Sequence, residues 1–331
     1  MTVLLTCAGS RVDVVHAFKT AFPQGPHDVR VLISDVGEAS PTRFAADGIV
    51  DLPMVGDPGY RDAVVAACRR EQVGALLPLT DLDPVELATA APELAGGGTS
   101  VFLPEPHIAR GCQDKWECHR MLLAAGLPSP PTWLAGSVDL AELPYPMLLK
   151  PRLGFAARHI YRAADSGELA FFERYSPLES VYQQALDGTE FSTDCLGDLR
   201  GRALGAIPRS MMQAKGGEQV KGESLDDPQL VELAVRTVET LGLRGPSCIQ
   251  CFRKDGEIQG ITDINTRFGG AFPLPLAAGG GYPELIVRIA AGERPESRVG
   301  SHRAGVVMTR YLDQLILDRT PDGLRAVPRN G

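Results

Sequence analysis

The segment from residue 247 to 270 holds side chains that could bind a metal ion and an anion. Asp263, Asn265 and Arg267 recur at every second position, and alternation along a strand directs all three to one face. The carboxylate and amide oxygens suit Mg²⁺, with Mn²⁺ as an alternative, because hard cations prefer oxygen ligands. The planar fork of Arg267 matches a phosphate or carboxylate group. For this pattern taken alone, the competing interpretation is the solvated face of an edge hairpin.

A hairpin brings a third oxygen ligand to this face. The Asp-Gly pair at 255–256 is a strong signal for a two-residue turn. Counting outward from it predicts that Gln250 lies opposite Ile261, with Asp263 as its diagonal neighbour on the same face. Diagonal Cβ atoms lie roughly 7 Å apart, which suits a cation held between them. The face runs into a glycine turn at 268–270, where backbone can approach a ligand closely.

Short apolar strands alternate with helical stretches in the first hundred residues. This alternation predicts a parallel, doubly wound sheet. The loop after the first strand, residues 6–11, has a single glycine and lacks G-x-G-x-x-G, so it is a weak dinucleotide-binding signal even though Asp35 ends the second strand. The expected strands are 3–6, 29–35, 48–53, 74–79 and 100–104, and the expected helices are 11–21 and 59–72.

A second, β-rich region follows a proline cluster at 128–131. Before the cluster, Asp114 and Glu117 resemble a capping box that opens a helix ending at Gly126. After it, the expected strands are 145–150, 158–163, 180–186, 191–196, 202–208, 247–253, 257–265 and 304–312, and the expected helices are 165–175 and 227–241, with a polar tail at the end.

The order of these motifs resembles the ATP-grasp superfamily, and most closely its short proteins similar to the large subunit of carbamoyl-phosphate synthase. The resemblance rests on Gln250 followed by D-x-N-x-R-F-G-G at 263–270, and it covers roughly residues 1–310. It implies an α/β fold with α+β lobes. The lobes it implies are a Rossmann-like pre-ATP-grasp domain at 1–112, a small ATP-grasp lobe with a lid at 113–187, and a large lobe with the metal site at 188–331.

The resemblance also implies roles for individual residues. The magnesium ligands would be Gln250, Asp263 and Asn265. The transferred phosphate and the substrate would meet Arg267, Arg209 and Lys215. ATP would lie against two lysines, a lid arginine, the hinge backbone and an acid that binds the ribose, namely Lys115, Lys150, Arg158, Gln183, Gln184, Ala185, Leu186 and Glu190. The loop 279–283 would close over the acyl substrate.

Three positions depart from the family pattern. The lid at 150–159 keeps one glycine, Gly154, where the family usually has several. The first hinge residue is Gln183 and the acidic metal ligand is Asp263, where the family commonly has Glu.

The implied function is an ATP-dependent carboxylate–amine ligase that forms an acyl phosphate, acting on amino acids in a dipeptide or γ-glutamyl ligation. Three alternatives stay open: carbamoyl-phosphate-type chemistry on bicarbonate or carbamate, an ATP-binding regulatory module without turnover, and an NAD- or nucleotide-sugar-binding Rossmann protein. Small-molecule carboxylate and amine substrates are the expected partners, and a homodimer is one candidate assembly.

Composition limits the remaining classes. The 331 residues are 44% hydrophobic and 22% charged, with a net charge of −8 and no Lys/Arg block, so nucleic-acid and membrane partners are disfavoured. We expect no signal peptide and no membrane span. Seven scattered cysteines favour a reducing cytoplasm, and Cys248 and Cys251 would face opposite sides of one strand and could not chelate one metal.

Overall fold

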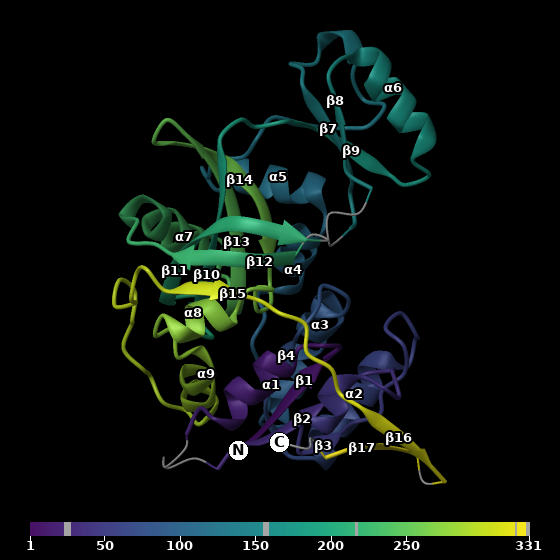
Figure 1. Ribbon diagram of the computed structural model, residues 1–331, viewed down its shortest axis with the longest axis vertical. Helices are drawn as coiled ribbons and strands as arrows, with labels where there is room; N and C mark the ends of the chain where they lie inside the picture. The colour runs from purple at the N-terminus through teal and green to yellow at the C-terminus, as the bar shows by residue number, and fades with distance from the viewer. Residues whose placement is uncertain (23–27, 155–158, 216–217, 322, 329–331) are drawn as a thin grey trace.

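Three sheets organise the chain in the computed structural model, which describes residues 1–22, 28–154, 159–215, 218–321 and 323–328. A parallel sheet from the N-terminal hundred residues lies at one end (Figure 1). A six-stranded antiparallel sheet occupies the middle, and a small four-stranded sheet lies at the other end. The predicted α/β class, with a Rossmann-like lobe ahead of a two-lobed unit, is confirmed.

The N-terminal sheet is fully parallel in the order β3-β2-β1-β4-β5. Its order reverses between β1 (Thr2–Thr6) and β4 (Val73–Pro78), so the carboxyl ends of these two strands lie at the switch point of the sheet. The outer strands are β2 (Arg30–Ile33), β3 (Gly48–Ile49) and β5 (Ser100–Val101). The accompanying helices are α1 (Val12–Lys19), η1 (Pro41–Phe44), α2 (Tyr60–Arg70) and α3 (Pro84–Gly96).

Two helices connect this lobe to the small sheet: α4 (Pro106–Gln113) and α5 (Lys115–Ala124). The predicted N-cap of α5 is confirmed, since the Asp114 side chain accepts hydrogen bonds from the amides of Trp116 and Glu117. The same carboxylate also forms an ion pair with Arg152 at the end of β7. The start of α5 is thereby fixed against the residue that follows β7.

The small sheet has the antiparallel order β6-β9-β7-β8 and is covered by one helix, α6 (Ser166–Tyr175). Leu149, Leu169 and Tyr182 form the centre of its own small core. Its strands are β6 (Thr132–Leu134), β7 (Met147–Pro151), β8 (Tyr161–Ala163) and β9 (Ser180–Gln184), and the turn η2 (Leu140–Glu142) precedes β7.

The six-stranded sheet presents two unlike faces. Apolar side chains such as Ile249 and Ile264 pack against α7 (Pro228–Leu241) on one face. The other face is polar along β10, β13 and β14. The sheet order is β14 (Glu257–Asn265), β13 (Gly245–Lys254), β10 (Thr189–Gly197), β11 (Ala203–Lys215), β12 (Glu218–Ser224) and β15 (Val307–Thr309).

Two helices that the sequence did not reveal join the sheets: α8 (Pro273–Ala277) and α9 (Tyr282–Ala290). Leu285 of α9 belongs to the same buried cluster as Val3 of β1 and Leu204 of β11. The N-terminal sheet and the six-stranded sheet therefore share one core, which fixes their relative position. Helices α3 and α4 were likewise not predicted.

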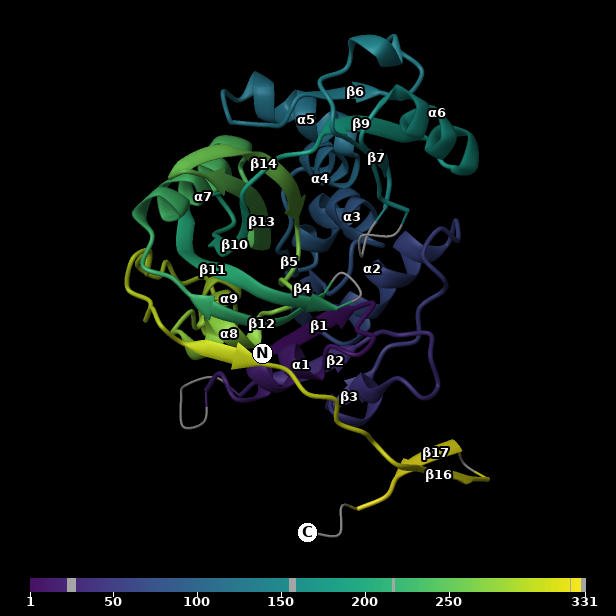
Figure 2. The same ribbon diagram turned by 45° about the horizontal axis from the view of Figure 1, so that its top comes forward.

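The C-terminal strand predicted at 304–312 is wrong in extent, because only Val307–Thr309 pair with β12. The apolar residues that suggested a longer strand, Tyr311 and Leu312, are 86% and 95% exposed. The tail instead forms a hairpin of β16 (Leu317–Thr320) and β17 (Gly323–Ala326), which projects from the body (Figure 2).

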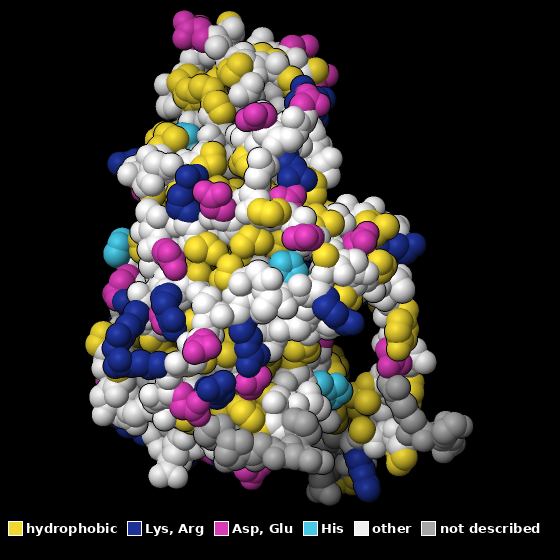
Figure 3. All heavy atoms as spheres, turned by 90° about the vertical axis from the view of Figure 1, so that its left-hand side faces the viewer, with side chains coloured by type: hydrophobic (Ala, Val, Ile, Leu, Met, Phe, Trp, Pro, Cys, Tyr) yellow, Lys and Arg dark blue, Asp and Glu magenta, His cyan; other side chains and the backbone are white. Residues whose placement is uncertain are grey.

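Within the described residues, no helix combines the length and apolar character needed to cross a bilayer. On the face shown in Figure 3, acidic and basic side chains are interspersed.

Candidate active site

The hairpin that carries the predicted metal ligands forms, but its register differs from the prediction. Gln250 pairs directly with Asp263, and not with Ile261, because the ladder shifts by one residue and leaves Thr262 as an extra residue. A second shift lies nearer the turn. Ile258, Ile261 and Ile264 are spaced by three, and only an extra residue at each step lets all three reach the core under α7. The bulges thus follow from apolar spacing.

The shifted register lines up four polar residues across four strands. Arg209 of β11 pairs with Ser192 of β10, Ser192 pairs with Gln250 of β13, and Gln250 pairs with Asp263 of β14. Directly paired residues point to the same face of a sheet. We call these four residues the polar row. With about 4.8 Å between strands, the row places the Arg209 backbone roughly 14 Å from that of Asp263.

A chain of hydrogen bonds orients the end of β14. Asn265 donates through Nδ2 to Asp263 Oδ2 at 3.3 Å, and Arg267 donates through Nη2 to Asn265 Oδ1 at 2.9 Å. Since arginine can only donate, the amide of Asn265 must direct its oxygen to Arg267. Arg267 also forms an ion pair with Asp81, in the loop after β4, at 2.9 Å. The three predicted residues therefore share one face, and the N-terminal sheet helps to hold them.

Arg209 is buried in the six-stranded sheet. Its Nε donates to Asp194 Oδ2 at 2.6 Å, and the two side chains are 4% and 3% exposed. Three atoms beside this pair, Arg209 Nη1, Asp194 Oδ1 and Ser192 Oγ, are buried without a hydrogen-bond partner. The glycine turn covers the pair, since a Cβ on Gly269 would lie 2.2 Å from Asp194 Oδ1.

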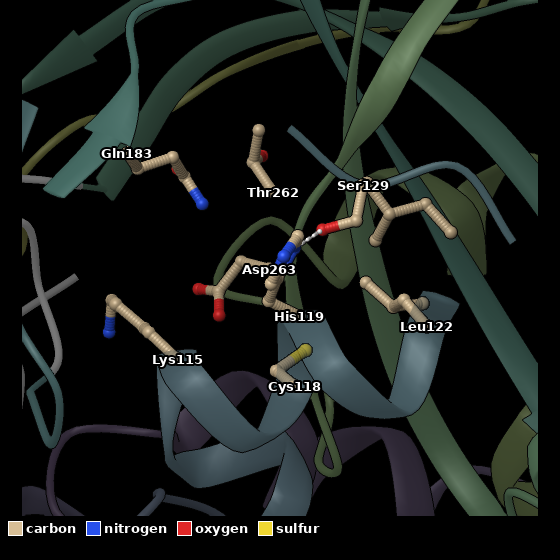
Figure 4. A pocket seen from close by; sticks show the side chains of 9 residues that line it. Lys115, Cys118, His119, Leu122, Ser129, Gln183, Thr262 and Asp263 are labelled. Atoms are coloured by element: carbon tan, nitrogen blue, oxygen red, sulfur yellow. Dashed lines mark hydrogen bonds between the residues drawn. The ribbon is translucent and has the colours of Figure 1, made fainter. Parts of the chain in front are cut away.

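Two lysines face Asp263 from the small lobe and from α5. Lys115 and Asp263 line one pocket with Gln183, and their polar ends point toward a common space (Figure 4). Lys150 lies beside this pocket, is 9% exposed, and donates to Gln183 Oε1 at 2.7 Å. Burial lowers the pKa of Lys150 to about 8, partly offset by the negative charge of Asp263. Lys115 donates to the carbonyl oxygen of Gly154 at 3.1 Å.

The predicted hinge follows β9 and leaves one amide free. Gln184 donates its amide to Pro131 and Ala185 donates to Pro146, so these two groups are used within the fold. The amide of Leu186 bonds to no residue in the described part of the chain. Glu190, at the start of β10, is half-buried, and burial raises its pKa while the charge of Lys150 lowers it.

The structure does not describe two of the predicted site side chains. Arg158 lies outside the described residues, as does the side chain of Lys215, whose backbone belongs to β11. The segment 279–283 contains the start of α9, and its role toward a substrate stays a prediction. Tyr282 is 1% exposed and donates to the Asp194 carbonyl oxygen at 2.8 Å, because α9 needs its first turn in the core.

Cys248 and Cys251 point to opposite faces of β13, as predicted. Cys248 Sγ accepts from Arg209 Nη2 at 3.5 Å on the polar face, while Cys251 belongs to the core under α7. Among the described residues, no group of three or more His, Cys, Asp or Glu side chains could hold a metal. A metal site on the polar face therefore depends on the amide oxygens of Gln250 and Asn265.

Sequence reasoning missed the contributions of the N-terminal lobe. Arg11, in the loop after β1, donates to the carbonyl oxygens of Phe268 and Gly269 at 3.2 and 3.1 Å. Asp81 follows β4 and pairs with Arg267. Both residues follow the two strands between which the sheet order reverses, so the pattern of parallel strands was the signal that could have marked them.

Two family descriptions match this sequence. Residues 3–102 match "PylC-like, N-terminal domain", and residues 178–313 match "ATP-grasp in the biosynthetic pathway with Ter operon". Residues 178–313 therefore belong to an ATP-grasp domain. This match includes the hinge, the polar row and the glycine turn.

Solved structures share the whole arrangement. The biotin carboxylase domain of Hydrogenobacter thermophilus 2-oxoglutarate carboxylase, solved with MgADP, ADP and bicarbonate, has a TM-score of 0.72 at 18% identity, covering 92% of this chain and 73% of that one. Staphylococcus aureus N5-carboxyaminoimidazole synthetase with ADP has a TM-score of 0.72 at 13% identity, covering 94% and 82%. Bacillus licheniformis L-amino acid ligase has a TM-score of 0.68 at 20% identity, covering 87% and 73%. At these identities, the likeness establishes the fold.

Proposed function

We propose that this ATP-grasp protein is a ligase that activates a carboxylate with ATP and joins it to an amine. The observation that carries the proposal is the convergence of Asp263, Asn265 and Arg267 on one polar sheet face, across from the buried Lys150. Oxygen ligands for a cation, a guanidinium for an anion and an ammonium for phosphate are what phosphoryl transfer from ATP requires.

The donor set fits one magnesium ion. Gln250, Asp263 and Asn265 would hold it through hard oxygen atoms, and a set with a single carboxylate leaves further positions to phosphate oxygens and water. When bound, Mg²⁺ neutralises charge on the β- and γ-phosphates. Mn²⁺ would fit the same donors.

The nucleotide would lie between the hinge and the polar face. The free amide of Leu186 would donate to the adenine ring, and the carboxylate of Glu190 would accept from the ribose hydroxyls. Lys150 and Lys115 would donate to phosphate oxygens, whose negative charge would pair with the two ammonium groups. The backbone amides of Gln184 and Ala185 are already bonded and would serve only to shape the hinge.

The chemistry then proceeds in two balanced steps. A carboxylate oxygen bonds to the γ-phosphorus while the bond to the β–γ bridging oxygen breaks, giving an acyl phosphate and ADP. The amine nitrogen next bonds to the acyl carbon while the bond to the phosphate oxygen breaks, and the amine proton leaves with the phosphate. Arg267 and Arg209 would steady the charge on the transferred group, with Lys215 as a further candidate.

Two alternatives predict different results in the same assay. Activation of bicarbonate would make ADP release depend on bicarbonate, and not on an amino acid. A regulatory module would bind ATP and release no phosphate with any substrate. Amino-acid substrates, with dipeptide or γ-glutamyl products, are the first class to test, because Arg267 could clamp an α-carboxylate.

The test is a phosphate-release screen with Mg-ATP over amino acids singly and in pairs, with and without bicarbonate. We expect release to require two substrates, and Asp263→Asn with Asn265→Ala to abolish it while the fold remains intact. Glu257→Gln with Gln259→Ala, on the exposed end of the same strand, is the matched control and should retain release. Full turnover by the Asp263/Asn265 variant would remove the proposed metal site.

A further inference from the structure

Lys150 is a buried cation that lacks an anionic partner. It is 9% exposed, and within the described residues it forms no ion pair. Its one hydrogen bond goes to the neutral amide of Gln183, through Nζ to Oε1 at 2.7 Å. A buried ammonium normally needs a charged partner, because transfer from water is costly.

Hydrogen bonds fix the orientation of the Gln183 amide. Thr132 donates its hydroxyl hydrogen to the carbonyl oxygen of Pro130 at 2.9 Å, so its Oγ1 can only accept from the side chain of Gln183. Gln183 accordingly donates Nε2 to Thr132 Oγ1 at 3.1 Å, which turns its Oε1 to Lys150. A glutamate at this position would place an oxygen against that accepting hydroxyl, so the pocket is built for the amide.

The pKa of Lys150 depends on its burial and on charged groups of three neighbouring elements. Desolvation is the largest effect and lowers its pKa to about 8. Asp263 of β14 and Glu190 of β10 favour the ammonium, while Lys115 of α5 opposes it. Above this pKa, the amine of the free protein is mostly neutral.

We propose that Gln183 is a positioning residue that keeps Lys150 without a counter-ion in the free protein. The phosphates of the nucleotide then become the counter-ion, and nucleotide binding is accompanied by protonation of Lys150. The inference rests on the proposed ATP site. In this step the neutral amine of Lys150 takes up one proton from the buffer, and no other bond changes. A carboxylate at position 183 would keep Lys150 protonated before the nucleotide binds. Binding would then no longer be accompanied by proton uptake.

The test is titration calorimetry with Mg-ADP in buffers of different ionisation enthalpy, which gives the number of protons taken up on binding. We expect proton uptake to be clear at about pH 8.5 and to become small at about pH 7, because the amine is mostly neutral only above its pKa of about 8. Gln183→Glu should bind without uptake at either pH. Gln259→Glu is the matched control, since this exposed side chain on β14 lies outside the proposed site and its uptake should equal that of the wild type.

Lys150→Arg supplies a second variant that is independent of position 183. Its guanidinium stays charged, so binding should proceed without uptake at about pH 8.5. Binding by the wild-type protein without uptake at that pH, or full uptake in Gln183→Glu, would overturn the inference. Absence of Mg-ADP binding by the wild type would instead remove the proposed function itself, so the two failures are distinguishable.

Discussion

Asp81 and Arg267 join the N-terminal sheet to the strand that carries the proposed metal ligands. Arg267 donates through Nη2 and Nε to Asp81 Oδ2 at 2.9 and 3.2 Å, and each side chain is about one-fifth exposed. The same guanidinium bonds to Asn265. A residue 186 positions away in sequence therefore orients a proposed catalytic group.

Asp81→Asn should lower turnover about tenfold, because Arg267 loses its charged anchor and its orientation becomes less fixed. The free energy of unfolding should fall by about 1 kcal/mol, since a charge-assisted hydrogen bond becomes a neutral one. Steady-state kinetics and denaturant unfolding measure the two effects. Glu86→Gln, which removes an exposed pair with Arg61, is the control and should change neither quantity appreciably.

Gln250→Glu should create magnesium binding that does not need a nucleotide. The new carboxylate would face Asp263 directly, with Cβ atoms about 5 Å apart, and two unpaired carboxylates at that distance repel. We expect the variant to have a lower Tm than the wild type without metal and to regain it with millimolar MgCl₂. Thermal unfolding with and without MgCl₂ measures both Tm values. Gln259→Glu, near the exposed start of β14, is the control and should show no recovery of Tm with MgCl₂.

Gly269→Ala should destabilise the protein by about 1–3 kcal/mol. The new methyl would lie 2.2 Å from Asp194 Oδ1 and 3.3 Å from Arg209 Nη2, so the buried ion pair or the turn has to move. Gly270→Ala is the matched control, because its Cβ would have no neighbour within 4 Å. Equal urea midpoints for the two variants would contradict the packing described here.

Lys150→Met should stabilise the nucleotide-free protein, because it removes a buried ammonium. The lowering of the Lys150 pKa from 10.5 to about 8 corresponds to roughly 3 kcal/mol at pH 7. Between those two values the unfolded chain binds more protons at Lys150 than the folded one, so wild-type stability rises with pH there. The difference between variant and wild type should therefore shrink from pH 8 to pH 10 in denaturant titrations. A constant difference would show that Lys150 does not titrate in this window.

Local patterns predicted the parallel strands of the first lobe, the cap at Asp114 and the shared face of Asp263, Asn265 and Arg267. Each of these depends on neighbouring residues only. The pairing of Gln250 was mispredicted because the bulges arise from isoleucine spacing against a core that α7 completes. The burial of Arg209 could not be read from its polar neighbours, since Asp194 and the turn at Gly269 reach it only in the folded sheet.

Contacts between distant parts of the chain explain the remaining omissions. Helix α9 was missed because its start, Gly281-Tyr282-Pro283, looks like a loop and becomes helical by packing between two sheets. The long final strand was predicted from apolar residues that find no partner strand. The domain boundaries at 112 and 187 and the individual roles of the site residues stay predictions.

The polar row takes its four residues from four strands. Binding of a ligand to this row therefore depends on correct assembly of the sheet. A synthetic peptide spanning β13 and β14 would keep Gln250 and Asp263 yet lack Ser192 and Arg209. Of the three pairings, that of Ser192 with Gln250 spans the longest stretch of sequence, and such pairings form slowly in folding. At the proposed site, nucleotide would thus bind only chains whose central sheet has reached full register, and mass action would draw the population toward that state.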